Sequence, residues 1–90
     1  MIGEMGIAQR RSDAILVREL GADLVLLETD VDRVHQLNAT AAFIWMHCEE
    51  ARSIDEMAEW LGEAFDVDET VARHDTVTTL ETFGALNLLA

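Results

Sequence analysis

Residues 23–45 read DLVLLETDVDRVHQLNATAAFIW, and this stretch decides the fold. Leu24–Leu27 is a continuous apolar run of strand length, and the turn-forming segment Thr29–Asp32 follows it. Arg33–Leu37 alternates loosely and predicts a second strand. Asn38 then stands where it can cap a helix, with no linker in between. The stretch therefore predicts a hairpin that leads directly into a helix.

The residues before this stretch predict one more strand. We expect three strands in the first half of the chain, over Ile15–Leu20, Asp23–Glu28 and Arg33–Leu37. Gly21-Ala22 is short enough for a tight hairpin, and the second connection has four residues. Two successive hairpins give an antiparallel meander with the middle strand in the centre. The third strand is then an edge unless another element covers it.

The second half of the chain predicts three helices. The first runs from about Ala39 to Glu50, the second opens at a capping box formed by Ser53 and Glu56, and the third is capped by Asp68 and continues to about Leu86. Each shows apolar residues at helical spacing. In the third helix the apolar face consists of Ala72, Thr76, Leu80, Phe83 and Leu86, and Asn87 follows where a left-handed residue is expected.

Composition limits the class of protein. The 90 residues predict a single domain over residues 1–90, and half of them are hydrophobic, which is enough for a packed core. We expect residues 1–13 to be a flexible lead-in. The single cysteine, Cys48, predicts a buried thiol in a reducing cytoplasm. No apolar run has the length of a membrane span.

The charge of the chain argues against nucleic acid and anionic membranes as partners. The formal net charge is −12, and residues 38–90 carry eleven acidic residues against only Arg52 and Arg73. Such a surface repels phosphate groups and suits a partner with basic residues. Solubility alone is an equally good explanation for most of these acids.

The sequence contains no catalytic or metal-binding constellation. The three histidines, His35, His47 and His74, are scattered, and Cys48 follows His47 directly, so the two side chains point about 100° apart on a helix. Asp30-x-Asp32 and Asp66-x-Asp68 lack the glycine and the glutamate of a calcium loop. There is no phosphate-binding glycine loop and no nucleophile elbow. We predict neither an enzyme nor a cofactor.

Four segments resemble the PqqD-like proteins, also called RiPP recognition elements. They are LVLLE (24–28), RVHQLNATAAFIW (33–45), SIDEMAEWLGEAF (53–65) and DTVTTLETFGALNLL (75–89), and the resemblance covers Ile15–Leu89. It implies an α+β fold in which a three-stranded antiparallel sheet precedes a winged-helix-like three-helix bundle. It also implies a protein that binds the leader of a ribosomally made precursor peptide and presents it to a maturation enzyme.

The resemblance also implies where the peptide lies. The leader is expected to add to the third strand, beside a face of the third helix. The implied peptide-binding residues are Arg33, Val34, His35, Gln36, Asp75, Thr76, Thr79, Leu80 and Phe83. An exposed strand edge offers unpaired N–H and C=O groups, which an extended peptide satisfies by pairing. The chain differs from the family pattern at Thr76 and Thr79, where Val and Phe are common.

Two other functions remain open from the sequence. One is a winged-helix nucleic-acid binder, in which the second and third helices form a helix-turn-helix. The third helix disfavours it, because a recognition helix needs basic or amide side chains and this one offers Arg73 and the late Asn87. The other is a regulatory interaction module. The residues do not reveal the precursor, the product class (lasso peptide, quinone cofactor or radical-made peptide), the partner enzyme, or whether the chain is a monomer or a weak homodimer.

Overall fold

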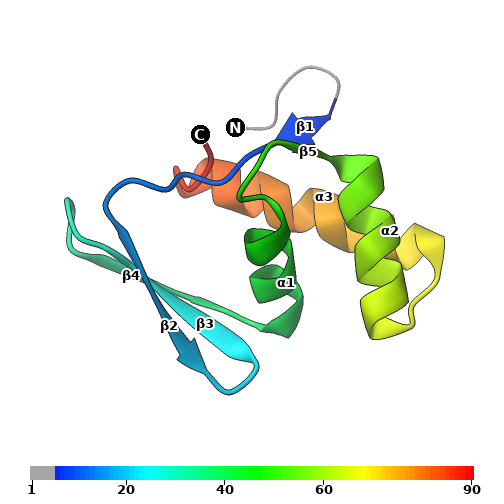
Figure 1. Ribbon diagram of the computed structural model, residues 1–90, viewed down its shortest axis with the longest axis horizontal. Helices are drawn as coiled ribbons and strands as arrows, with labels where there is room; N and C mark the ends of the chain where they lie inside the picture. Colours follow the sequence, from blue (N-terminus) through cyan, green and yellow to red (C-terminus); the bar gives the residue numbers. More distant parts are fainter. Residues whose placement is uncertain (1–5) are drawn as a thin grey trace.

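The computed structural model describes residues 6–90, and its elements follow the predicted α+β order (Figure 1). The first half contains the strands and the second half the helices, apart from one short strand between the first two helices. The elements are β1 (Ile7–Ala8), β2 (Ile15–Leu20), β3 (Asp23–Glu28), β4 (Arg33–Leu37), α1 (Ala39–His47), β5 (Arg52–Ser53), α2 (Ile54–Phe65) and α3 (Glu69–Ala85).

The main sheet is the predicted meander. Its order is β2-β3-β4, and both pairs are antiparallel with the bounds expected from the sequence. Leu20 pairs with Asp23, so the first connection is the two-residue turn Gly21-Ala22. Gly21 has a φ of +64°, a conformation that a residue without a Cβ adopts at no steric cost. The turn therefore fixes the register of the first hairpin.

One face of the sheet packs against the helices. On β3, Leu24, Leu26 and Glu28 are buried and alternate with half-buried residues, which is the period-2 pattern of a sheet covered on one face. The helices α1 and α3 complete the core, and the rings of Trp45 and Phe83 meet edge to face at 5.6 Å. The sheet and all three helices thus share one hydrophobic core.

The helix starts agree with the sequence. The side chains of Asn38, Ser53 and Asp68 each accept a backbone N–H of the first turn, and Ser53 with Glu56 forms the predicted capping box. The end of α1 was predicted wrongly, because the helix stops at His47 rather than Glu50. An N-terminal residue explains this early stop: the Arg10 N–H donates to Cys48 O at 2.8 Å, and its guanidinium donates to Trp45 O at 3.1 Å.

The N-terminal segment differs from the flexible lead-in expected for residues 1–13. Within its described part, Ile7–Ala8 pairs with Arg52–Ser53 as a second, two-stranded sheet. Arg11 N donates to Leu88 O at 2.8 Å, so the segment also joins the C-terminus. The partners are backbone groups near the ends of helices that lie far away in the sequence. Such pairing produces no periodic pattern of apolar residues in the sequence. The part of the expectation that falls on residues 1–5 lies outside the described residues.

The chain closes with a Schellman motif at the end of α3. Leu88 N donates to Phe83 O at 2.8 Å and Asn87 N donates to Gly84 O at 3.1 Å. Asn87 itself has a φ of +59°, which confirms the predicted left-handed residue. Leu88 is then directed into the core, where it is fully buried.

This geometry predicts that two substitutions of Asn87 differ in their effect on stability. Asn87→Ala should lower the free energy of unfolding by about 1 kcal/mol, because a Cβ without a local hydrogen-bonding group is strained at this φ. Asn87→Gly should leave it within about 0.5 kcal/mol of the original value. Urea denaturation followed by circular dichroism measures both. Equal losses for both variants would show that the Asn87 side chain, and not its backbone conformation, is what matters.

Candidate functional site

The open edge of β4 is the first part of the site. Leu20 and Asp23 flank a two-residue turn, so they form a pair that exchanges both backbone hydrogen bonds. Hydrogen-bonded pairs recur at every second position, and the bond from Thr29 N to Ala14 O, 2.9 Å, falls at one of these positions. Every second residue of β3 therefore bonds to β2, and the residues in between, Leu24, Leu26 and Glu28, bond to β4.

The register then determines which groups of β4 remain free. The partners of those three β3 residues are Leu37, His35 and Arg33. The residues between them, Val34 and Gln36, direct their N–H and C=O groups away from β3. No further strand pairs with β4 in the described part of the chain. The free backbone groups of β4 are therefore those of Val34 and Gln36, whereas those of His35 are bonded to β3.

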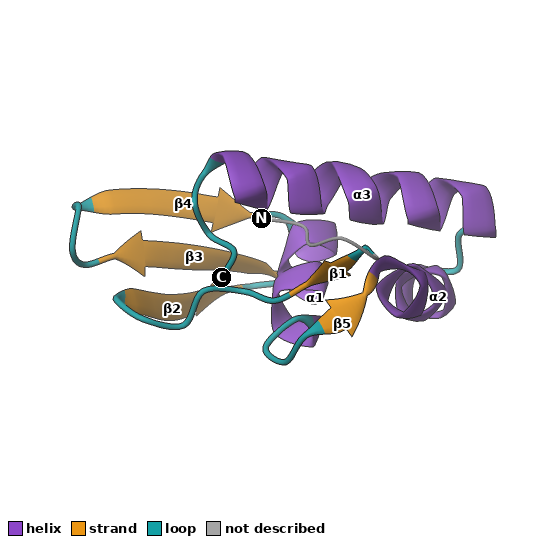
Figure 2. Cartoon of the chain, turned by 90° about the horizontal axis from the view of Figure 1, so that it is seen from above, coloured by secondary structure: helices purple, strands orange, loops and turns teal. Residues whose placement is uncertain are grey.

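A groove beside this edge is the second part of the site. In Figure 2, β4 is the strand of the sheet nearest to α3, and β2 is the strand farthest from it. Between β4, the start of α1 and α3 lies an open groove of about 440 Å³. Its lining residues are His35, Gln36, Leu37, Asn38, Thr40, Ala41, Asp75, Thr78, Thr79, Thr82, Phe83 and Leu86.

The structure brings most of the predicted peptide-binding residues to this groove. His35, Gln36, Asp75, Thr79 and Phe83 line it directly. Arg33 and Val34 do not line the groove but lie exposed on β4, where Val34 supplies free backbone groups. The predicted set therefore forms one continuous region, except for two residues of α3.

Those two residues, Thr76 and Leu80, belong to the core. Both are fully buried and neither lines the groove. The Thr76 hydroxyl donates to Ala72 O at 2.8 Å, which satisfies its polar group inside the helix. Threonine can therefore occupy this buried position at little cost.

The sequence analysis missed seven lining residues, one of which, Leu37, ends β4. Asn38, Thr40 and Ala41 come from the first turn of α1, and Thr78, Thr82 and Leu86 come from α3. A signal for the α3 residues was present, because Asp75, Thr78, Thr79 and Thr82 recur at i, i+3, i+4 and i+7. This polar stripe lies beside the apolar stripe and marks the groove side of the helix.

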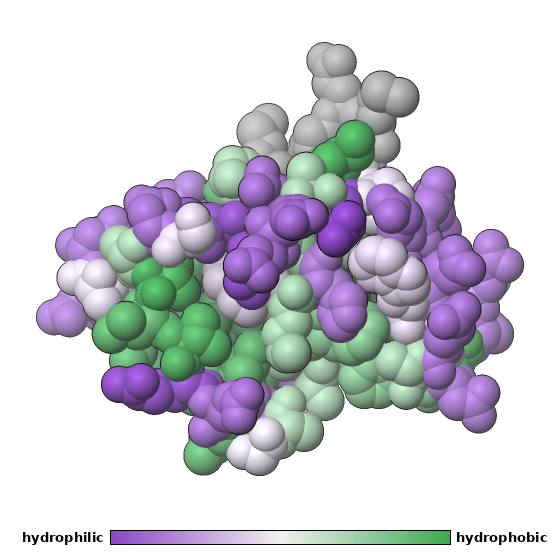
Figure 3. Space-filling model, viewed as in Figure 1, coloured by the Kyte–Doolittle hydropathy of each residue, from purple (hydrophilic) through white to green (hydrophobic). Residues whose placement is uncertain are grey.

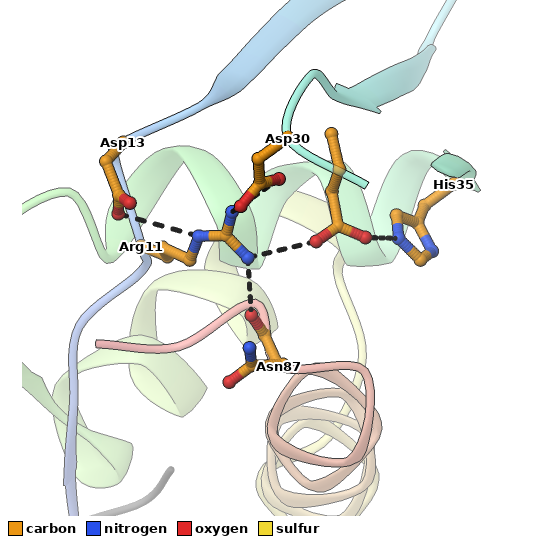
Figure 4. A network of polar contacts seen from close by, with 6 residues as sticks. Arg11, Asp13, Asp30, His35 and Asn87 are labelled. Atoms are coloured by element: carbon orange, nitrogen blue, oxygen red, sulfur yellow. Dashed lines mark hydrogen bonds and ion pairs between the residues drawn. The ribbon is translucent and has the colours of Figure 1, made fainter. Parts of the chain in front are cut away.

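An ionic network centred on the buried Glu28 holds one residue of the groove, His35 (Figure 4). Arg11 Nη1 donates to Glu28 Oε1 at 2.9 Å and to Asn87 O at 3.2 Å, and Nη2 forms an ion pair with Asp30 at 3.1 Å. On the other oxygen of the carboxylate, His35 Nε2 lies 2.7 Å from Glu28 Oε2. An ionised carboxylate only accepts, so the imidazole supplies the proton of this bond. Glu28 thus fixes the ring of a groove residue.

This network changes the acidity of its central group. The hydrogen bond from His35 and that from Arg11 favour the ionised carboxylate and outweigh its burial, so the pKa of Glu28 lies below its ordinary value. Only 3% of Glu28 is exposed. A buried carboxylate in a small sheet is therefore satisfied on both oxygens.

The other face of the sheet carries aliphatic side chains that are exposed or half-buried among the described residues. Leu16, Leu27 and Val34 lie in one row across the three strands, and Leu16 and Val34 are 48% and 64% exposed. Figure 3 shows apolar residues gathered over this side of the molecule, around β2 and β3. The edge of β2 is open as well, but the described groove lies along β4.

The single thiol of the chain lies in the core. Burial raises the pKa of the Cys48 thiol to about 11, so it is protonated at neutral pH and a poor nucleophile or metal ligand. Among residues 6–90, no group of three His, Cys, Asp or Glu side chains is placed to hold a metal ion. Nor is any helix in this range long and apolar enough to cross a membrane.

The fold is thus an α+β domain in which a three-stranded antiparallel sheet packs against three helices, with a groove between β4, α1 and α3. The sequence profile of the family described as "Coenzyme PQQ synthesis protein D (PqqD)" matches residues 23–89. The chain therefore belongs to the PqqD family, as the resemblance in its sequence implied.

Two solved structures have the same fold. One is described as "TbiB1 in Complex with the TbiA(beta) Leader Peptide"; it is 23% identical, has a TM-score of 0.76, and the alignment covers 90% of this chain and 93% of that one. The other, "Lasso peptide synthetase B1 complexed with the leader peptide", is 24% identical, with a TM-score of 0.77 and coverage of 94% and 98%. No curated protein sequence matches the chain significantly.

The network predicts a pH-dependent contribution to stability. Because the pKa of Glu28 is lower in the folded state, its contribution is complete above its unfolded pKa, near 4.5, and is lost as the pH falls through the folded value. Glu28→Gln should therefore lower the free energy of unfolding at pH 7. Below pH 4.5, the free energies of unfolding of the variant and of the original protein should become more similar. Urea titrations between pH 7 and pH 3 measure this difference.

Glu19→Gln is the matched control, because Glu19 lies exposed on the neighbouring strand. It should leave stability almost unchanged at every pH. A loss for Glu28→Gln that stays constant with pH would show that packing, and not the charge of the carboxylate, is responsible.

Proposed function

We propose that this protein binds an extended leader segment of a precursor peptide as a fourth strand on β4 and presents it to a maturation enzyme. The observation that carries this proposal is the open edge at Val34 and Gln36, directly beside the groove under α3. Each of these residues offers one N–H and one C=O to a new strand. Such backbone bonds supply affinity with little dependence on sequence.

The groove explains why we assign the peptide to β4 and not to the open edge of β2. Alternate side chains of an added strand point to the same side as His35 and Leu37, which is the side of the groove. There they meet α3 and the first turn of α1. The groove does not extend to β2, since none of its lining residues comes from that strand.

The comparisons support the identity of the ligand. Both solved structures with this fold are described as complexes with a leader peptide. Family membership supports a non-catalytic role, which is part of the proposal. The buried, unpaired Cys48 fits a cytoplasmic location, which is part of the proposal.

The geometry gives no support to the nucleic-acid alternative. The basic residue near the start of α3, Arg73, forms an ion pair with Asp55 of α2. The other charged side chains on α3 include Glu69, Asp75 and Glu81. A helix with this balance repels phosphates rather than binding them.

A proline substitution on β4 tests the strand addition. Val34→Pro removes an N–H that faces the open edge, so the fold should survive while affinity for the leader falls at least about tenfold. His35→Pro removes an N–H that bonds to Leu26 and should unfold the sheet. Circular dichroism measures folding, and titration with labelled leader segments of candidate precursors, taken from short reading frames near this protein's gene, measures binding.

Val34→Ala is the control for the side chain. It keeps the backbone N–H and should retain most of the binding, because the Val34 side chain points away from the groove. Mass spectrometry of the mixtures should show an unchanged peptide mass. Full binding by folded Val34→Pro would show that the leader does not add to this edge.

A further inference from the structure

The groove contains one charged group whose partner is missing. Among the described lining residues, Asp75 is the sole carboxylate, and none is Lys or Arg. Asp75 is half-buried on α3, and no ion pair joins it to another residue of the described chain. The other titratable side chain that lines the groove, His35 of β4, is already held by Glu28.

The rest of the groove is divided into two ends. Around Asp75, the α3 side of the groove is polar, with the hydroxyl groups of Thr78 and Thr79 within one turn. Further along α3, Phe83 and Leu86 line it, and Leu37 of β4 adds to this apolar end. A ligand that lies along the groove therefore meets an apolar end and an anionic end.

The spacing of these ends matches that of an extended peptide. Asp75 and Phe83 are eight residues apart on α3, which corresponds to about 12 Å along the helix axis. Four residues of an extended strand span about 13 Å, and residues i and i+4 point to the same side. Two residues span about 7 Å and six about 20 Å, so neither fits.

We propose that Asp75 selects leaders that carry a Lys or Arg four residues away from a large apolar side chain. This inference rests on the proposed function and specifies its ligand. The apolar side chain occupies the end at Phe83 and Leu86, and the cation pairs with Asp75. The net charge of −12 adds a long-range attraction for cationic segments, while Asp75 fixes where the cation lies.

A peptide-display library tests this selection. Random twelve-residue peptides are selected on the intact protein, on Asp75→Asn and on Glu81→Gln. Glu81→Gln is the matched control, because Glu81 lies on the same helix and loses the same charge but does not line the groove. Peptides from the intact protein and from Glu81→Gln should be enriched in a basic residue four positions from an apolar one. Peptides from Asp75→Asn should lack this enrichment.

Purified peptides give the quantitative test. For the consensus peptide, replacing its basic residue by Gln should weaken binding to the intact protein by about fivefold, and should change binding to Asp75→Asn by less than twofold. Circular dichroism confirms that Asp75→Asn is folded. The comparison of the two peptides on the intact protein needs no variant at all.

The outcomes separate this inference from the proposed function. Selected peptides that bind through β4 but show no basic position would overturn the role of Asp75 and leave strand addition intact. If peptides selected on Asp75→Asn still carry the basic residue, the cation pairs with another acid, and the role of Asp75 is overturned as well. If no peptide is enriched on the intact protein, the proposed function itself fails.

Discussion

The two-residue turn at Gly21-Ala22 is the constraint on which the site depends. It makes Leu20 and Asp23 a hydrogen-bonded pair, and the alternation of an antiparallel sheet carries that choice through β3 to β4. The same parity directs Leu24 and Leu26 into the core. A shift of one residue would expose this apolar set and would also exchange the free and bonded amides of β4.

The ionic network connects this sheet to both ends of the described chain. Arg11 comes from the N-terminal segment, Glu28 from the end of β3, and the carbonyl of Asn87 from the close of α3. His35 brings the edge strand into the same network. One buried carboxylate therefore links Arg11 of the N-terminal segment to His35 of the groove, and the two hydrogen bonds lower its pKa.

Local signals made much of this structure predictable from the sequence. The three strands and the capping residues Asn38, Ser53 and Asp68 were confirmed because turns and caps act over a few residues. The early stop of α1 and the docking of residues 6–13 were not foreseen. Both arise from bonds such as Arg10 N to Cys48 O, between residues far apart in sequence.

The candidate site shows the same division. Its location beside β4 followed from the meander and the family resemblance, but the identity of its α3 residues required the helix to be oriented. Thr76 was expected in the groove and is buried, whereas Thr78 and Thr82 line it. A hydroxyl that bonds to the preceding turn, as that of Thr76 does, gives no sign of its burial in the sequence.

Hydrogen exchange at single amides tests the central claim most directly. When the leader binds, the Val34 and Gln36 amides should exchange at least about tenfold more slowly, because they become bonded to the added strand. The His35 amide, already bonded to β3, should change much less. Unchanged exchange at Val34 and Gln36, or new protection confined to Ile15, Val17 and Glu19 on the edge of β2, would contradict the account.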